Sequence, residues 1–460
     1  ESRIALTDKD VKILFSPIGT TDPVRNCRDG ACLHILRHYH PDKVVLYFTA
    51  EMEKRERNTH MYTLGIEHVQ PGCPVESLYS GIVDAHLYDA YLHDLPGHVL
   101  KLHQIYPEAE ILLNLSSGTP QIKVVLAIMS TEYAWCRGIQ VASPEHRSNT
   151  NNIPVQDEED VEEMLACNED DEPDAPNRCE EPHLEILRFY REKYEIMSLV
   201  NQYEYIGAWA FCKGSHTISA QTKKLIQFAM YRSDLQTKAA QQIMRKYHGQ
   251  ALFPFEREGE SLTEYLLTMQ IHKEKKQYAS FMVQISPFLY ELFVTYAKMN
   301  LKIPLLNYRE KVAGRRILRR QTLLQKPQGP ELIAYLDHVW PQPFYDSELS
   351  FILLYQVFCF AEQFDGAKDA EKHHEFMTDP LMNSANPYMD KLRKLRNNTA
   401  HEIINVTEET IQKRTGLTPD DIMTSFWNLL SIIYGSPVNR QRMAYKRLNQ
   451  WIGESLLINL

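Results

Sequence analysis

The sequence predicts an α/β domain followed by an all-α domain, and three observations support this prediction. The amino-terminal region alternates short apolar runs with longer amphipathic segments, as chains with alternating strands and helices do. From residue 183 onward, apolar residues recur at helical spacing and strand signals are nearly absent. A strongly acidic segment separates the two regions. We therefore expect two domains of different fold class joined by a polar stretch.

The alternation in the first region indicates a doubly wound, mainly parallel sheet of the Rossmann-like type, with helices on both faces. The expected strands are four runs rich in Val, Ile, Leu and Phe, at residues 11–15, 43–48, 111–115 and 138–141. The expected helices are residues 30–39, 50–67, 92–106 and 119–135. Sheets of this kind bind ligands at the carboxyl ends of their strands, where the connecting loops diverge.

The acidic segment, residues 156–182, holds thirteen Asp and Glu residues against one base, Arg178. Its local charge of −12 exceeds the net charge of −10, so the remaining chain sums to about +2 and does not repel nucleic acid as a whole. Three prolines and few large apolar residues are typical of a solvated linker or exposed loop. We therefore predict a first domain at residues 1–170, ending in an acidic linker, and a helical domain at residues 183–460.

Seven segments of the second region carry apolar residues at helical spacing. They are residues 183–211, 220–247, 262–275, 281–300, 347–364, 419–434 and 438–452. A basic stretch at residues 308–320 contains six Arg and Lys residues. It has two interpretations, a strip that follows an RNA backbone or a solvated helix face.

Composition excludes several classes of protein. Hydrophobic residues make up 43% of the chain and charged residues 24%, as in ordinary globular proteins. No apolar run has the length needed to span a membrane. The eight cysteines form no Cys-x-x-Cys pair, which favours reduced thiols in the cytoplasm over disulfides or a zinc site. No set of His, Asp and Glu has metal-ligand spacing, so we expect no bound metal.

Two loops at predicted strand ends have the composition of ligand-binding turns. Residues 16–23 read Ser-Pro-Ile-Gly-Thr-Thr-Asp-Pro, and residues 116–121 read Ser-Ser-Gly-Thr-Pro-Gln. Hydroxyls and backbone N–H groups around a glycine suit an anionic or sugar-bearing ligand, and Thr119-Pro120 is also typical of a helix cap and first residue. Neither loop matches a Walker sequence or the Gly-x-Gly-x-x-Gly fingerprint, which argues against a nucleoside triphosphatase and a dehydrogenase. The alternative is that both loops are ordinary turns.

Residues 391–404 concentrate the groups needed to cleave RNA without a metal. The segment reads Lys-Leu-Arg-Lys-Leu-Arg-Asn-Asn-Thr-Ala-His-Glu-Ile-Ile. His401 suits proton transfer, Arg396 grips a phosphate with two donors, and Asn397 adds a neutral donor. On one straight helix Arg396 and His401 are about 140° apart, so they serve one phosphate only if Arg396 lies before the helix or just inside it. The alternative is that His401 is a capping or core residue and that the spacing arose by chance.

Together, the two loops and this segment resemble the stand-alone CARF–HEPN ribonucleases that accompany type III-A (Csm) CRISPR systems. Residues 16–25 and 116–121 are similar to the ligand loops of a CARF domain. Residues 396–401 are similar to the Arg-x4-His motif of a HEPN domain. The resemblance covers nearly all of the chain, while the acidic segment is not among the hallmarks of the family.

The resemblance implies a cytoplasmic homodimer whose two CARF domains form one pocket for a cyclic oligoadenylate activator, the hexa-adenylate being favoured over the tetra-adenylate. The implied pocket residues are Gly19, Thr20, Thr21, Asp22, Ser116, Ser117, Gly118, Thr119 and Gln121. Thr119 is further implied in slow cleavage of the activator. The implied catalytic residues are Arg396, Asn397 and His401 of both subunits, which meet at the dimer axis. The resemblance implies no metal or other cofactor, no membrane and no stable association with the effector complex.

The expected activity is therefore activator-gated cleavage of single-stranded RNA in antiviral defence, with little sequence specificity. Attack by the neighbouring 2′-hydroxyl would leave a 2′,3′-cyclic phosphate on one product and a 5′-hydroxyl on the other. Two other hypotheses remain open. One is a nucleotide-sensing regulator whose helical domain binds without cutting, and the other is a nucleotide-metabolising enzyme with a helical cap.

Overall fold

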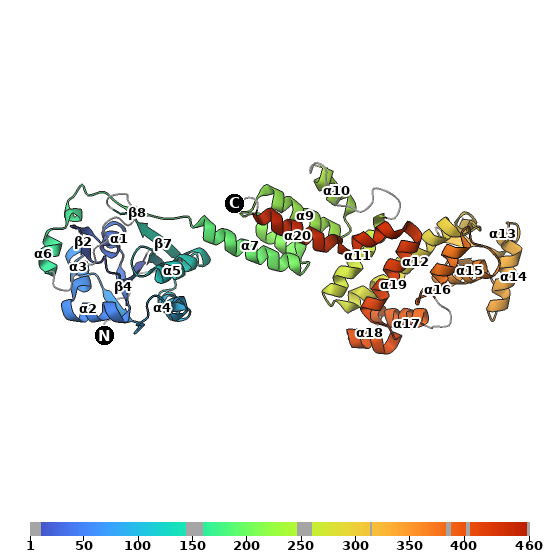
Figure 1. The fold of residues 1–460 in the computed structure, drawn as a ribbon, viewed down its shortest axis with the longest axis horizontal. Coiled ribbons are helices and arrows are strands. Elements are labelled where there is room, and N and C mark those ends of the chain that lie inside the picture. Colours follow the sequence, from blue (N-terminus) through green and yellow to red (C-terminus); the bar gives the residue numbers. More distant parts are fainter. Residues whose placement is uncertain are drawn as a thin grey trace. The chain divides into compact units, whose positions relative to one another are not determined.

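A computed structural model describes residues 11–143, 160–245, 260–312, 315–382, 388–401 and 405–457. The chain divides into two compact units, Glu1–Arg191 and Glu192–Leu460. Figure 1 shows a sheet covered by helices in the first unit and an assembly made almost entirely of helices in the second. The two predicted fold classes are thereby confirmed. The division falls inside helix α7 (Glu185–Asn201), beyond the acidic segment, and the domain bounds 1–170 and 183–460 stay a prediction.

The first unit is built on a six-stranded sheet in the order β5-β4-β1-β6-β7-β8. Paired strands run parallel, except that β8 runs antiparallel to β7. The strand bounds are Lys12–Pro17 (β1), Lys43–Phe48 (β4), Val75–Tyr79 (β5), Glu110–Asn114 (β6), Cys136–Val141 (β7) and Cys179–Glu180 (β8). From β1 at the centre of the sheet, the chain first adds β4 and β5 on one side and then β6, β7 and β8 on the other. The loops that follow β1 and β6 therefore lie at the point where the strand order reverses, which is the usual ligand site of such sheets.

Helices cover both faces of this sheet. One face packs against α1 (Ala31–Tyr39), α2 (Ala50–Thr59) and α3 (Met61–Val69), and the other against η1 (Tyr88–Tyr91), α4 (Asp94–Ile105) and α5 (Pro120–Glu132). Successive strand residues alternate between the two cores because strand side chains alternate between faces. Leu14 belongs to the first core, whereas Ile13 and Phe15 belong to the second. The predicted doubly wound architecture is confirmed.

Two predicted elements of the first unit differ from the structure. The single helix expected at residues 50–67 is two helices, because His60 adopts a left-handed conformation with φ of 54° between α2 and α3. The edge strand β5 was not expected. Its residues are half-buried or exposed, so it lacks the continuous apolar run that marks the inner strands.

The described part of the acidic segment is folded onto the first unit, which differs from the solvated linker that its composition predicts. It forms α6 (Val161–Ala166), η2 (Glu169–Asp171) and β8. Asp170 is buried and accepts a hydrogen bond from Arg28 at 3.1 Å, and Asn168 donates to Asp29 at 2.7 Å. These partners belong to β3 (Arg28–Asp29), which forms a hairpin with β2 (Val24–Arg25). Arg28, far away in sequence, thus balances part of the acidic charge, and Asn168 ties the segment to Asp29.

The second unit is helical around an aromatic and aliphatic core. After α7 its helices are α8 (Tyr205–Cys212), α9 (Ala220–Ser233), α10 (Thr237–Arg245), α11 (Glu260–Glu274), α12 (Tyr278–Asn300), η3 (Leu305–Asn307), α13 (Arg320–Leu324), α14 (Gly329–Val339), α15 (Phe351–Gln363), α16 (Ala370–Thr378), α17 (Tyr388–His401), α18 (Glu408–Thr415), α19 (Pro419–Tyr434), η4 (Ser436–Met443) and α20 (Ala444–Leu457). Within the described ranges, none of the helices combines the length and apolar character needed to cross a membrane.

One interpretation of the basic stretch at residues 308–320 was a solvated helix face, and this interpretation is wrong. The stretch forms the antiparallel strands β9 (Arg309–Val312) and β10 (Arg315–Leu318), and β10 also pairs with β11 (Ser347–Glu348). The Arg319 side chain pairs with Glu310, and Arg320 pairs with Asp337. The other four basic side chains, which the RNA-binding interpretation needs, lie outside the described part of the structure.

Candidate functional site

The two loops singled out in the sequence meet at the carboxyl edge of the sheet. The loop after β1 and the loop after β6 follow neighbouring parallel strands. A methyl group added at Gly19 would lie 2.8 Å from the backbone nitrogen of Gly118, so only a glycine allows this approach. Gly118 itself has φ of +81°, a conformation that also favours glycine. The two glycines therefore let the two backbones form one continuous rim.

Asn114, at the end of β6, holds the two loops together, and the sequence analysis missed it. The side chain is fully buried. Its Nδ2 donates to Ser16 Oγ at 2.9 Å and to Ser117 Oγ at 3.0 Å. Its Oδ1 accepts from the backbone N–H groups of Ser116 at 2.9 Å and Ser117 at 3.2 Å. A polar residue that interrupts an apolar run, one residue before a Ser-Ser-Gly turn, marks this position in the sequence but does not identify its partners.

The carboxylate of Asp22 is buried and shapes the first loop from inside. Its Oδ2 accepts from the N–H of Gly19 at 3.0 Å, and its Oδ1 accepts from the N–H of Cys32 at 3.2 Å. Burial raises the pKa of Asp22, while its hydrogen bonds, including one from Ser117, and the charge of Lys123 act to lower it. Asp22 and Ser117 therefore serve the loop backbone in this conformation. Their predicted contact with a ligand stays a prediction.

The other predicted pocket residues keep part of their surface at the rim. Thr119 caps α5 as predicted, since its side chain accepts from the N–H of Ile122 and Pro120 is the first helical residue. The residues that remain accessible, half-buried or exposed, are Gly19, Thr20, Thr21, Ser116, Gly118, Thr119 and Gln121. The structure thus brings all of the predicted loop residues to one edge of the sheet. Their role in binding a ligand stays a prediction.

Lys123 adds a cation to this rim that the sequence analysis missed. It lies in the first turn of α5, one turn after the cap residue Thr119. Burial lowers the pKa of Lys123, and the charge of Asp22 acts in the opposite direction. Among the described residues its ammonium group has no hydrogen-bond or ion-pair partner. A half-buried lysine beside backbone N–H groups at a helix start suits a phosphate.

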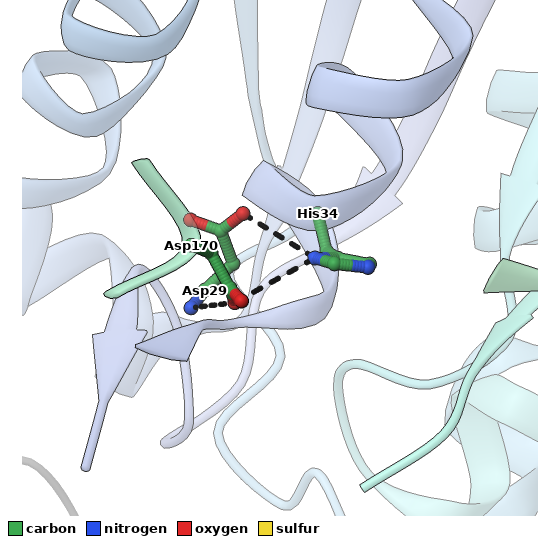
Figure 2. Close-up of side chains that lie close together, drawn as sticks. All are labelled: Asp29, His34 and Asp170. Carbon is green, nitrogen blue, oxygen red and sulfur yellow. Dashed lines mark hydrogen bonds and ion pairs between the residues drawn. The ribbon is translucent and has the colours of Figure 1, made fainter. Parts of the chain in front are cut away.

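A second polar cluster lies behind the first loop, on the side of α1. Figure 2 shows the side chains of Asp29, His34 and Asp170 directed toward one another. His34 Nδ1 is 3.3 Å from Asp29 and 3.7 Å from Asp170. Arg178 donates through its guanidinium to Asp170 at 2.6 Å and through its backbone N–H to His34 Nε2 at 2.9 Å. Because Nε2 accepts, Nδ1 carries the proton and donates to Asp29.

This cluster is built as an ion-pair network. Its ligand-type atoms lie within 4.8 Å of one another. Arg37 also binds Asp29 through Nε at 2.8 Å, so guanidinium groups already balance both carboxylates. Burial raises the pKa of Asp29, but hydrogen bonds from His34, Arg37 and Asn168 lower it more, and it lies well below its ordinary value. The network fastens the acidic segment to α1 and to the hairpin that follows the first loop.

The predicted catalytic residues all lie on one helix, α17, in the second unit. Leu392 and Leu395 are buried and anchor the helix. Asn397 and His401 are exposed, and Arg396 is half-buried. The Nη1 of Arg396 donates to Asn397 Oδ1 at 3.1 Å. The arrangement rules out His401 as a core residue. Residues 402–404 of the predicted segment lie outside the described part of the chain.

Helix α17 does not meet the condition under which one chain presents both charged groups to one phosphate. It begins at Tyr388, so Arg396 lies in its interior and not before or within its first turn. Five residues along a helix separate Arg396 from His401 by about 140° around the axis and about 7.5 Å along it. Asn397 and His401, four residues apart, share the exposed face. The Arg396 guanidinium approaches that face only through its bond to Asn397.

Comparisons with known proteins match both units. The family model described as the Cas_Csm6 CARF domain matches residues 74–179, and the Cas_Csm6 HEPN domain matches residues 252–453. The first match includes the Ser116 loop but not the Gly19 loop, and the second includes the whole of α17. Strand β1, which precedes the Gly19 loop, pairs with β6, which precedes the Ser116 loop. Both loops therefore belong to one sheet.

Proteins named CRISPR system endoribonuclease Csm6 are similar to this chain, one over most of its length and another over about half. The Mycobacterium tuberculosis protein is 28% identical over 418 residues, which covers 89% of this chain and 92% of that protein. The Enterococcus italicus protein is 36% identical over 206 residues, 43% of this chain and 47% of that protein.

A solved structure shows the same fold. Enterococcus italicus Csm6 bound to cyclic hexa-2′-fluoro-hexa-dAMP superposes with a TM-score of 0.62 and 21% identity, over 97% of this chain and all of that one. Two domain models of one family, in the order expected from the two folds, agree with the similarity over nearly the full length. The chain therefore belongs to the Csm6 family of CARF–HEPN proteins.

Proposed function

We propose that this chain is a metal-independent endoribonuclease that cuts single-stranded RNA with little sequence specificity once a cyclic oligoadenylate binds its first unit. The products would carry 2′,3′-cyclic phosphate and 5′-hydroxyl ends. Its place would be type III CRISPR antiviral defence in the cytoplasm. The relatives named endoribonuclease support the reaction class, and eight free thiols suit a reducing compartment.

The exposed face of α17 is the observation that carries this proposal. His401 is open to substrate and suits removal of the proton from a ribose 2′-hydroxyl. Arg396 supplies a permanent charge for the phosphate oxygens, and its bond to Asn397 directs the guanidinium toward the same face. Asn397 offers a neutral donor for charge that develops in the transition state. The imidazolium that forms on His401 returns the 2′-hydroxyl proton to the leaving 5′-oxygen, so the proposed reaction uses these side chains and no metal ion.

The helix geometry favours a site assembled from two chains. On one α17 the arginine and the histidine point about 140° apart, so a phosphate held by one histidine is poorly placed for the arginine of the same helix. A two-fold axis beside the exposed face brings a second α17 with its own Arg396, Asn397 and His401. This geometry supports a homodimer with one composite site, and the proposal needs no stable association with the effector complex.

The rim of the first unit is the proposed activator site. The backbone N–H of Gly118, the threonine hydroxyls of the rim and Lys123 match the phosphates and riboses of an oligoadenylate. A two-fold dimer suits a ring with an even number of adenylates. We favour the hexa-adenylate, since the solved structure of the Enterococcus italicus relative is bound to a cyclic analogue of six nucleotides. Slow activator cleavage involving Thr119 belongs to the same proposal.

The first experiment is incubation of the purified chain with labelled single-stranded RNA in EDTA, with cyclic hexa-adenylate, cyclic tetra-adenylate or no activator. We expect cleavage only with one ring, unchanged by EDTA, with 2′,3′-cyclic phosphate ends detected by their resistance to a phosphatase that removes 3′-monophosphates. The decay of the activator, followed in the same samples, tests the role of Thr119.

Replacing His401 by Ala separates the nuclease from a nucleotide-sensing regulator. We expect H401A to lose RNA cleavage while it keeps activator binding and thermal stability, because the side chain is exposed. His216→Ala, at another exposed histidine of the second unit, is the matched control and keeps its activity. Full cleavage by H401A would overturn the proposed mechanism, and the absence of RNA cleavage by the unaltered chain with either ring would favour the regulator.

A further inference from the structure

The second unit contains a cavity that the mechanism above does not use. It has a volume of about 390 Å³ and lies between α11, α12 and the end of α19. This is within the range of small-molecule and nucleotide sites, roughly 300–1,000 Å³. Its walls come from three helices of the same unit, so the cavity does not depend on how the two units are placed.

The cavity is next to the catalytic helix. Tyr265 of α11 lines it. Burial raises the pKa of Tyr265 and the positive charge of Arg396 acts to lower it, so the phenol and the guanidinium are electrostatic neighbours. Helix α12, which forms the opposite wall, packs directly against α17. A group bound in the cavity would therefore be a short distance from a phosphate held by Arg396.

The lining combines a flat apolar surface with polar groups. Two aromatic side chains line the cavity, the half-buried Tyr265 and the buried Phe288. Glu291, Thr295 and Lys298 follow one another along α12 at a spacing of four and three residues, which places them on one face. Within the described part of the chain, the Glu291 carboxylate has no hydrogen-bond or ion-pair partner and is exposed.

We propose that this cavity is a subsite for one nucleobase of the RNA substrate, adjacent to the scissile phosphate, in which the base stacks on Tyr265 and presents its hydrogen-bonding edge to Glu291. This inference rests on the proposed ribonuclease function. Single-stranded RNA is commonly recognised in this way, with splayed bases stacked on aromatic side chains and bound along their edges. Lys298, at the end of the same face, supplies a cation for a flanking phosphate.

Glu291 determines which nucleobases the subsite prefers. A carboxylate only accepts hydrogen bonds. Guanine offers two adjacent donors, and adenine and cytosine each offer an amino group. The one donor of uracil lies between two carbonyl oxygens, which a carboxylate repels. The enzyme should therefore disfavour uridine at one position beside the cut, within cleavage that is otherwise unspecific.

The test uses the full-length chain with cyclic hexa- or tetra-adenylate, whichever activates it, and a pool of unstructured RNA of random sequence whose cut positions are read by sequencing. For the unaltered chain we expect adenosine, cytidine or guanosine to exceed uridine at least about fivefold at one position next to the cut. Glu291→Gln should lower this ratio to below about twofold, because an amide both donates and accepts. Glu371→Gln, the same change at an exposed glutamate of α16 outside the cavity, should leave the ratio unchanged.

Variants of Tyr265 test the stacking wall separately. Tyr265→Leu should raise KM for RNA at least about fivefold with kcat nearly unchanged, since loss of a stacked base weakens binding. Tyr265→Phe keeps the ring and should keep KM. Thermal unfolding midpoints equal to that of the unaltered chain show that the changes are local.

The outcomes separate the two proposals. If the unaltered chain cuts no RNA with either activator, the proposed function itself fails. If it cuts RNA without disfavouring uridine, or if E291Q and Y265L behave as E371Q does in base preference and KM, the ribonuclease stands and the base subsite is wrong.

Discussion

Replacing Asn114 by Ala tests whether this buried amide holds the activator rim together. The change removes four hydrogen bonds, three of them at the buried residues Ser16 and Ser117. An unsatisfied buried N–H of Ser117 costs about 1–3 kcal/mol, and two buried hydroxyls each lose a bond that contributes about 0.5–1.5 kcal/mol. The Ser116 N–H is half-buried and finds water instead. We expect the first unit to lose about 2–6 kcal/mol of its free energy of unfolding.

Scanning calorimetry measures this loss. The midpoint temperature at which the first unit unfolds should fall, while the midpoint of the second unit should not change. For a unit of this size each kcal/mol corresponds to about 2–4 °C, so the midpoint should fall by at least about 4 °C. Asn58→Ala, at an exposed asparagine of α2, is the matched control and should change it by less than about 1 °C. Hydrogen exchange at the Ser117 amide should accelerate in N114A only. An unchanged midpoint, or a Ser117 amide as protected as before, would refute the assigned role.

Two further predictions concern the same unit. The pKa of Asp29 is lower in the folded state than the unfolded value of about 3.9, so its stabilising contribution is present above about pH 4 and lost as the pH falls through the folded value. Asp29→Asn should therefore lower the thermal midpoint at pH 7 more than at pH 3, and an equal decrease at both would contradict the network. Gly19→Ala, whose methyl group meets the Gly118 backbone at 2.8 Å, should weaken activator binding at least about tenfold in calorimetric titration. Gly97→Ala, where an added methyl meets nothing within 4 Å, should bind normally.

The inner strands were predictable because burial on both faces leaves a signature in the sequence. Strands β1 and β4 are almost wholly buried, and so their residues form continuous apolar runs. The edge strand β5 carries no such run, since only one side of an edge strand packs. The short strands β9 and β10 carry none either, because half or more of their residues are charged. Sequence patterns therefore located the centre of the sheet and missed its periphery.

The partners of the acidic segment and of Asn114 were beyond sequence reasoning for a different reason. Composition predicts solvation when charges are counted locally, but Asp170 is neutralised by Arg28, which lies 142 residues away in the chain. Asn114 bonds Ser16 across 98 residues. Such pairings depend on strand order, which brings β1 beside β6, and a local pattern contains no information about partners at this distance. The loops could be identified from their own residues, whereas the groups that fix their shape could not.

The geometry of α17 leads to a final prediction, which distinguishes a site made by two chains from one made by each chain alone. Arg396→Ala and His401→Ala should each be inactive when purified separately. If the arginine of one helix serves the histidine of the other, mixing the two variants should restore activity, because each mixed dimer keeps one intact pair contributed by different chains. With random exchange of subunits half of the dimers are mixed, and each keeps one of the two Arg–His pairs of its composite site. If the two pairs contribute equally, the recovery approaches about a quarter of the unaltered activity. If Arg396 instead reaches His401 along its own helix, every chain in the mixture lacks one of the two groups and no activity returns.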